Sequence, residues 1–240
     1  MLKLTYTILS VTWLVTSSYA ALAPFIQKCK WDNRACLLKS SQTAIPYFAA
    51  GVSELGMSPL DPVALNTVSY NEGGLEITFK DMILSGTRNC QVKDVERNKD
   101  EQWLKFEVEC PIQVHGNYII SGNLFNIPVE GSGPFSVKTD KLFILLKCRL
   151  VSVDGENGQK YWKLNNDEHT YEFQSKTLLK FENLFNGDTE KAAPIMTILE
   201  ESWKEVVQTF GKPIVSEVLN RIVSHLDVFF KTVPISELEI

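Results

Sequence analysis

Few residues in this chain of 240 amino acids have the types and spacing that catalysis requires. Gly131-Ser132-Gly133 places a serine between glycines, but a nucleophile elbow needs Gly-x-Ser-x-Gly at a strand-to-helix junction, so we interpret it as a turn. His115 falls in a predicted strand and His225 at the edge of a predicted helix, where structural roles are the simpler interpretation. Glu200-Glu201 fits a solvated helix face. The sequence therefore predicts no catalytic residue, no metal site, no cofactor and no enzyme.

The five cysteines carry the clearest chemistry. Cys29 and Cys36 bound a short loop, for which a disulfide is the simplest interpretation in an oxidising compartment. Zinc is the weaker alternative, because the three histidines show no paired spacing. Cys90 and Cys110 flank a predicted hairpin and fall opposite each other, so we predict a cross-strand disulfide. Cys148 is left over, either as a buried thiol or as a partner in an intermolecular bond.

Residues 1–20 predict a secretory signal peptide, with the positive Lys3, an apolar run and the small-residue pattern Ser18-Tyr19-Ala20. Its removal leaves one domain, 21–240, and changes the formal charge from −5 to −6 because Lys3 is lost. An acidic chain is a poor candidate for nucleic acid or anionic membrane surfaces. No later stretch reaches the roughly 20 apolar residues of a membrane span. We expect a secreted, extracellular protein with no nucleic-acid partner and no stable membrane insertion.

The longest periodic pattern runs from Asp188 to Val233. Its apolar residues recur every three or four positions, which is the helical period. The steps stay in phase across Gly211 and Pro213, so the sequence predicts one long, kinked helix instead of two separate ones. Asp188 or Thr189 is expected as its N-cap. So wide an apolar surface needs other elements to cover it.

Upstream of this helix the pattern favours strands. Leu75, Ile77 and Phe79 alternate with polar residues. A shorter helix is expected from Cys36 to Val52. The other predicted strands are Gln91–Glu96, Gln102–Cys110, Gln113–Leu124, Gly133–Thr139, Lys141–Val153, Lys160–Phe173 and Thr177–Phe181. The predicted fold class is α+β, a long curved antiparallel sheet wrapped around one long C-terminal helix with a short N-terminal helix.

The sheet's inward residues are large and apolar, as are those of the helix. Such an interior either packs solid or leaves an elongated apolar cavity for a long hydrophobic ligand. Burial of that ligand would contribute about 0.8 kcal/mol per methylene. Periodicity alone does not separate these two alternatives.

Several short motifs occur in a characteristic order. They are Cys29 with Cys36, Leu60-Asp61-Pro62, Gly116-Asn117-Tyr118 followed by Gly122, the run 128–135, Phe181-Glu182-Asn183-Leu184-Phe185-Asn186-Gly187-Asp188, Leu199-Glu200-Glu201-Ser202-Trp203 and the run 228–234. In this order and spacing the sequence resembles the insect takeout / haemolymph juvenile hormone-binding protein family over essentially the whole predicted mature chain. The resemblance implies half of a tubular lipid-binding fold, a Cys29–Cys36 disulfide and an internal tunnel.

Members of that family are carriers of lipophilic molecules, which implies a juvenile hormone, isoprenoid or fatty acid ligand, in haemolymph or another extracellular fluid. The haemolymph carriers use a cysteine late in the chain for a second disulfide, whereas this sequence has none after Cys148. That difference favours the takeout branch over juvenile hormone itself.

A tunnel of this kind would be lined by twelve residues, among which we expect Tyr118 and Trp203 to hold the ligand's head and Trp31 to close the mouth. The twelve are Trp31, Phe48, Ile77, Phe79, Phe106, Val108, Tyr118, Ile120, Phe143, Trp203, Val207 and Phe210. We expect a monomer. The alternative is a secreted signalling or structural protein of the same fold, with a filled core and no ligand.

Overall fold

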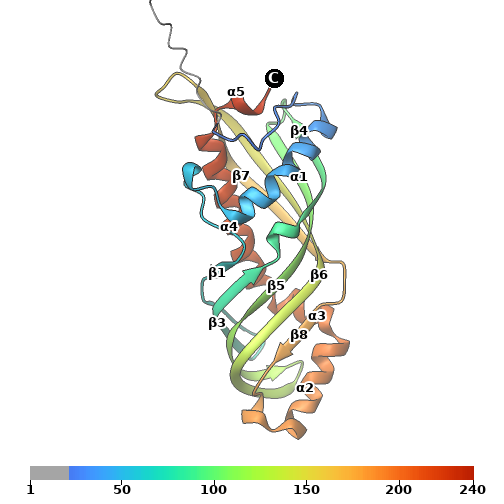
Figure 1. The fold of residues 1–240 in the computed structure, drawn as a ribbon. Helices are drawn as coiled ribbons and strands as arrows, with labels where there is room; N and C mark the ends of the chain where they lie inside the picture. Colours follow the sequence, from blue (N-terminus) through green and yellow to red (C-terminus); the bar gives the residue numbers. More distant parts are fainter. Residues whose placement is uncertain (1–21) are drawn as a thin grey trace, which may run out of the picture.

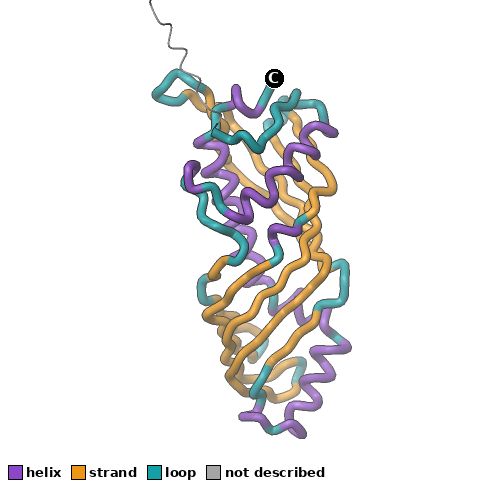
Figure 2. Tube along the Cα trace, in the orientation of Figure 1, coloured by secondary structure: helices purple, strands orange, loops and turns teal. Residues whose placement is uncertain are grey.

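The computed structural model describes residues 22–240, without the side chains of residues 166 and 167. The predicted signal peptide therefore lies outside the described residues. The described chain is elongated, and one sheet runs diagonally along its length with helices packed against it (Figure 1). Figure 2 shows strands throughout the length and helices near both ends.

All strand pairs in the described part of the chain are antiparallel and form one sheet in the order β1-β3-β5-β6-β7, with β2 paired to β3, β4 to β5 and β8 to β6. The bounds are β1 Val63–Leu65, β2 Val68–Glu72, β3 Leu75–Ser85, β4 Gln91–Asn98, β5 Trp103–Leu124, β6 Ile127–Asp154, β7 Lys160–Phe173 and β8 Leu178–Phe181. The predicted fold class is confirmed.

β5 and β6 have 22 and 28 residues and form the central hairpin. Their turn is Phe125-Asn126, and both residues have positive φ, as the two-residue hairpin turn requires. The sequence analysis predicted each of these strands as two shorter ones. The structure joins them, because the ladder absorbs the irregularity as a register shift between Cys110 and Ile112, around Pro111.

The interpretation of Gly131-Ser132-Gly133 as a turn is wrong, because these residues lie within β6. A segment that crosses the strand closely explains the glycines. A Cβ on Gly133 would lie 2.7 Å from the carbonyl oxygen of Glu182, and one on Gly131 would lie 3.0 Å from Cα of Leu184. Glycine is the residue that permits such an approach. The motif thus packs the strand against the segment that leads into the C-terminal helices.

The predicted single C-terminal helix is divided into α2 (Thr189–Glu201), α3 (Trp203–Phe210) and α4 (Lys212–Thr232). Helical hydrogen bonds continue up to the residue at each break. Ser202 donates to Ile198 O at 2.9 Å and accepts from Val206 N at 3.1 Å, and Gly211 donates to Val207 O at 3.1 Å and accepts from Val215 N at 3.0 Å. The predicted helical phase of this segment is therefore confirmed, and the prediction of one continuous helix is wrong. Asp188 is the N-cap, as predicted, and accepts a hydrogen bond from Lys191 N at 3.1 Å.

The N-terminal helix α1 (Arg34–Ala50) contains Pro46 and begins after Asn33, whose side chain accepts from Cys36 N. Both predicted disulfides, Cys29–Cys36 and Cys90–Cys110, are present. Cys148 is fully buried in β6 and belongs to neither. The remaining short helices are η1 Ser53–Leu55, η2 Thr87–Asn89, η3 Phe185–Gly187 and α5 Ile235–Leu238.

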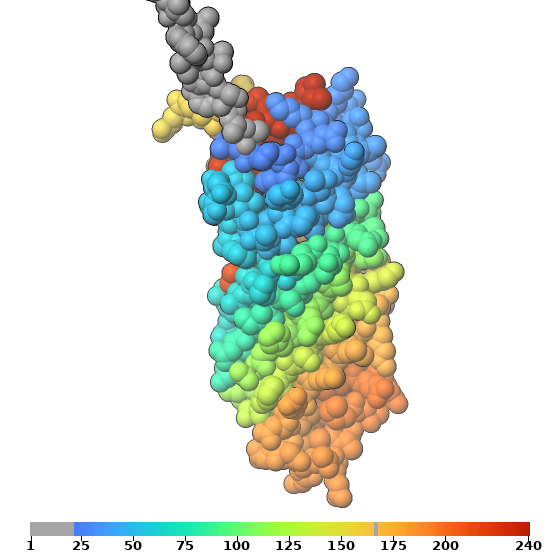
Figure 3. Space-filling view, in the orientation of Figure 1, coloured from blue at the N-terminus to red at the C-terminus, as the bar shows by residue number. Residues whose placement is uncertain are grey.

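The buried side chains form three clusters along the molecule. One lies between the β3–β5–β6 region and α2 to α4, a second between α1, β4 and the end of α4, and a small third cluster contains Leu142, Ile144 and Leu219. In the space-filling view the N-terminal residues cover one end and the residues of α2 and α3 form the other (Figure 3). Within the described residues, no helix is both long and apolar enough to cross a membrane.

Candidate ligand-binding cavities

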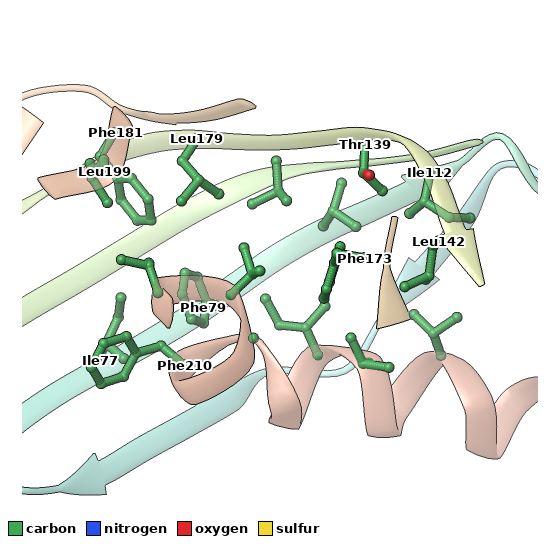
Figure 4. Close-up of a pocket in the computed structure, with 18 of the residues that line it drawn as sticks. Ile77, Phe79, Ile112, Thr139, Leu142, Phe173, Leu179, Phe181, Leu199 and Phe210 are labelled. Atoms are coloured by element: carbon green, nitrogen blue, oxygen red, sulfur yellow. The ribbon is translucent and has the colours of Figure 1, made fainter. Parts of the chain in front are cut away.

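A narrow apolar cavity lies between the sheet and the C-terminal helices. Strand alternation directs Leu75, Ile77 and Phe79 of β3 inward. The helices supply Val206, Phe210, Ile214 and Val218 among others, at the spacing that gathers side chains on one face. In Figure 4 side chains from the sheet and from the helix below it point toward one another. We call this space the distal cavity, and the centres of water molecules could occupy about 100 Å³ of it.

Thr139 is the one wall residue of the distal cavity with a polar side chain, and its hydroxyl lies 3.1 Å from that of Ser175. The oxygen of Thr139 is visible among the carbon atoms of the lining in Figure 4. This cavity can therefore contact an apolar chain but offers little to a polar group.

A second and wider space, the proximal cavity, lies between α1, β4 to β7 and the end of α4. Phe48 of α1 packs on Phe229 of α4 with ring centroids 5.2 Å apart. Phe106 and Val108 of β5 and Leu226 of α4 add to its wall. The centres of water molecules could occupy about 230 Å³, more than twice the value for the distal cavity. This volume of about 230 Å³ lies just below the roughly 300–1,000 Å³ that is usual for ligand sites.

Charged side chains stand in the wall of the proximal cavity. Arg97, whose side chain is 9% exposed, forms an ion pair with Glu239. The second carboxylate oxygen of Glu239 lies 3.5 Å from Lys99 Nζ. The guanidinium carbon of Arg97 is 4.2 Å from the centre of the Trp162 ring. Burial lowers the pKa of Arg97 to about 10, because a low-dielectric surrounding disfavours the charged form.

Arg97 was not among the predicted site residues, because the predicted strand Gln91–Glu96 stops one residue before it. The structure extends β4 to Asn98 and pairs Arg97 with Leu104. Val95, two positions earlier, is 1% exposed. Since residues two apart share a face of a strand, the side chain of Arg97 follows that of Val95 into the interior. The two-residue alternation that places Arg97 on the same face as Val95 can be read from the sequence.

Eight of the twelve residues predicted to line a tunnel lie in a cavity wall. The distal cavity contains Ile77, Phe79, Ile120, Val207 and Phe210, and the proximal cavity contains Phe48, Phe106 and Val108. Whether they contact a ligand stays a prediction.

The other four predicted residues lie outside both walls. Phe143 falls on the opposite face of β6 from Leu142 and Ile144, because alternate residues of a strand point apart. Trp31 is 38% exposed, with Lys99 Nζ 5.5 Å from its ring centre. Trp203 is half-buried against the cluster around Leu142.

Tyr118 is 1% exposed and is bonded to the protein itself. Its hydroxyl donates a hydrogen bond of 2.7 Å to the backbone oxygen of Glu182. Burial raises the pKa of Tyr118 to about 12. Asn183 Nδ2 also donates to Ser132 O at 2.9 Å. These bonds attach the segment before α2 to β5 and β6.

Two of the histidines lie on different elements, His225 on α4 and His115 on β5. In His225, Nδ1 lies 2.9 Å from Arg221 O and Nε2 lies 2.7 Å from Ser58 O, so the ring joins α4 to the connection before β1. His115 is exposed on β5. Among the described residues, no group of three or more His, Cys, Asp and Glu side chains could hold a metal ion.

The fold and the cavities can be compared with known proteins. The crystal structure of Takeout 1 from Epiphyas postvittana superposes with a TM-score of 0.86 and 25% identity, covering 89% of this chain and 99% of that one. The circadian clock-controlled protein daywake of Drosophila melanogaster is 22% identical over 197 residues, 74% of this chain and 73% of its own length. A putative beta-carotene-binding protein of Schistocerca gregaria is 26% identical over 136 residues, 55% of this chain and 54% of its own.

The match to a family is broader than any of these pairwise similarities. Residues 8–239 match the family described as haemolymph juvenile hormone binding protein. The match includes both walls of the distal and proximal cavities and the glycine crossing in β6. This chain belongs to the haemolymph juvenile hormone-binding protein family.

Proposed function

We propose that this protein is a secreted carrier that binds a small, elongated hydrophobic ligand in the distal and proximal cavities. The observation that carries the proposal is the pair of apolar cavities along the C-terminal helices, in which the centres of water molecules could occupy about 100 and 230 Å³. Burial of each methylene there would contribute about 0.8 kcal/mol. The ligand classes that fit are isoprenoids and fatty acyl lipids, in line with the names of the family and of the beta-carotene-binding relative.

The part of the proposal that concerns secretion rests on the two disulfides, which persist in oxidising compartments. The predicted signal peptide supports the same location. We propose no catalytic role, and an esterase assay on the pure protein tests that part.

The test of the carrier function is native mass spectrometry of the protein secreted by insect cells, before and after organic extraction. A carrier is expected to lose the mass of one lipophile per chain on extraction, and analysis of the extract would identify it. The stripped protein should then melt at a higher temperature when lipophiles are added back, because a ligand that binds the folded state stabilises it.

The rival function is that of a signalling or structural protein with a filled core. Its supporting observation is the narrowness of the distal cavity. It predicts a chain that carries no lipophile as isolated and whose melting temperature is unchanged by juvenile hormone and fatty acids. That combination of results would overturn the carrier proposal.

A further inference from the structure

The proximal cavity contains a buried cation, Arg97, in a wall that is otherwise mostly apolar. The side chain of Arg97 is 9% exposed and borders the same space as Phe106, Leu150 and Leu226. Removing a charged group from water is costly unless another group pairs with it. A solid apolar core would not require an arginine at this position.

The protein supplies only part of a partner for this cation. Glu239 contacts Arg97 Nη1 with one carboxylate oxygen, and its other oxygen lies 3.5 Å from Lys99 Nζ. One carboxylate is thus shared by two cations, which leaves the group of Arg97, Lys99 and Glu239 with a formal surplus of one positive charge. A guanidinium can bind a carboxylate through two parallel N–H···O bonds, and Glu239 uses one nitrogen.

Charged residues nearby do not cancel the surplus from inside the cavity. Asp94 and Glu96 lie on the other face of β4, near Lys105 Nζ at 3.9 and 3.5 Å. Glu237 accepts a hydrogen bond from Leu22 N at 2.9 Å. None of these carboxylates lines the proximal cavity.

Two hydroxyl groups of this wall, those of Ser40 and Thr87, already donate to the protein backbone. Ser40 Oγ donates to Gln27 O at 3.0 Å, and Thr87 Oγ1 donates to Leu60 O at 3.1 Å. The distal cavity presents only Thr139. Arg97 is the one cationic residue among the described residues that line the two cavities, so a polar head that enters them would meet its strongest donor there.

We propose that Arg97 binds the carboxylate of an acidic lipophile, a long-chain fatty acid or acidic isoprenoid, whose chain runs from the proximal cavity toward Ile144 and Leu219. The proposal rests on the carrier function and adds the head-group class and the direction of the ligand. Glu239 competes with the ligand for Arg97, because it is the carboxylate that occupies this position in the protein alone.

The experiment compares palmitic acid with methyl palmitate, which has the same chain without the charge. Both displace the uncharged fluorophore N-phenyl-1-naphthylamine from the stripped full-length secreted protein at pH 8. The acid is expected to bind at least tenfold more tightly than the ester. In Arg97→Gln the affinity for the acid should fall by about tenfold or more, with the ester within twofold, since a charge-assisted pair is lost.

Two further variants separate this role from a structural one. Glu239→Gln should raise the affinity for palmitic acid and leave methyl palmitate unchanged, a gain that a misfolded protein would not show. Lys93→Gln removes a positive charge from the exposed side of the same strand and should change neither affinity.

Three results would overturn the head-group site while the carrier function stands. The wild-type protein could bind acid and ester equally, Arg97→Gln could weaken both ligands by the same factor, or Glu239→Gln could leave the acid's affinity unchanged. If the wild-type protein binds neither the fluorophore, nor palmitic acid, nor methyl palmitate, the carrier function itself is overturned.

Discussion

Ile144, on β6, and Leu219, on α4, belong to one packed cluster, and each lines both cavities. They are 6% and 1% exposed. The two side chains therefore form the partition between the proximal and distal cavities. Under the proposed carrier function, the length of the lipid chain that the protein can enclose depends on whether these two side chains keep the cavities separate.

Replacing Leu219 by alanine should join the two cavities and shift the preferred fatty acid toward longer chains. The substitution should also cost about 2–5 kcal/mol of unfolding free energy, as buried Leu→Ala changes do. Affinities across a series of chain lengths, with urea unfolding of the same variant, measure both effects. Leu55→Ala is the control, because Leu55 is 3% exposed and lines neither cavity. An unchanged chain-length preference in Leu219→Ala would contradict the partition.

Phe106→Glu should reduce binding of N-phenyl-1-naphthylamine at least tenfold, because it places a carboxylate in the apolar wall of the proximal cavity. The matched control is Ile119→Glu. Ile119 lies on the same strand but is 48% exposed and in neither wall. Fluorescence titration of the two variants should show loss in the first and wild-type affinity in the second. Equal affinities would place the ligand elsewhere.

Tyr118→Phe tests whether this residue fixes the protein or the ligand. Loss of the hydrogen bond to Glu182 O should lower the unfolding free energy by about 1 kcal/mol. Ligand affinity should not change, because Tyr118 is in neither cavity wall. Thermal unfolding and palmitate titration give the two numbers. If Tyr118→Phe instead loses most of its affinity for palmitate at unchanged stability, Tyr118 binds the ligand's head, as the sequence predicted.

The N-cap of α2 should make stability depend on pH in the acid range. The hydrogen bond from Lys191 N lowers the pKa of Asp188 below its ordinary value of 3.8 in the folded protein. A lowered pKa means that the carboxylate stabilises the fold above about pH 4, and that the contribution disappears as the pH falls through the lowered pKa.

Asp188→Ala should therefore melt below the wild-type protein at pH 7, with the difference shrinking below pH 4. Asp188→Asn keeps an oxygen that can cap the helix and has no titration of its own, so its melting temperature should lack this acid-dependent component. Calorimetry from pH 2 to 7 checks both. A difference between Asp188→Ala and wild type that is constant over the whole range would refute the assignment.

The sequence patterns predicted those features of the fold that depend on the local geometry of the backbone. The helical phase from Ile195 to Phe229 and the alternation in β3 come from the turn and pleat of the backbone, and both are present. The break at Ser202 has no such signal, because the apolar steps of the sequence continue through it.

The candidate site was predictable only in part for a related reason. Apolar alternation identified Phe79 and Phe106 as inward residues, but Phe143 lies in the run Leu142–Leu146, where both faces are apolar and the parity is undetermined. The partner of Arg97 could not be found from the sequence either, since Glu239 reaches it only through the folded C-terminal segment.

That C-terminal segment also contacts the start of the described chain: Cys29 N donates to Leu238 O, and Ile240 N donates to Cys29 O. Contacts between such remote residues form more slowly than hairpins such as β5–β6. During folding, the inner face of the curved sheet would thus be open before the segment Leu226–Glu239 covers it. Under the proposed carrier function, a lipid present where the chain folds would enter the open face of the sheet before the cavities are closed. The first cargo would then be set by the lipids of the compartment in which the chain folds.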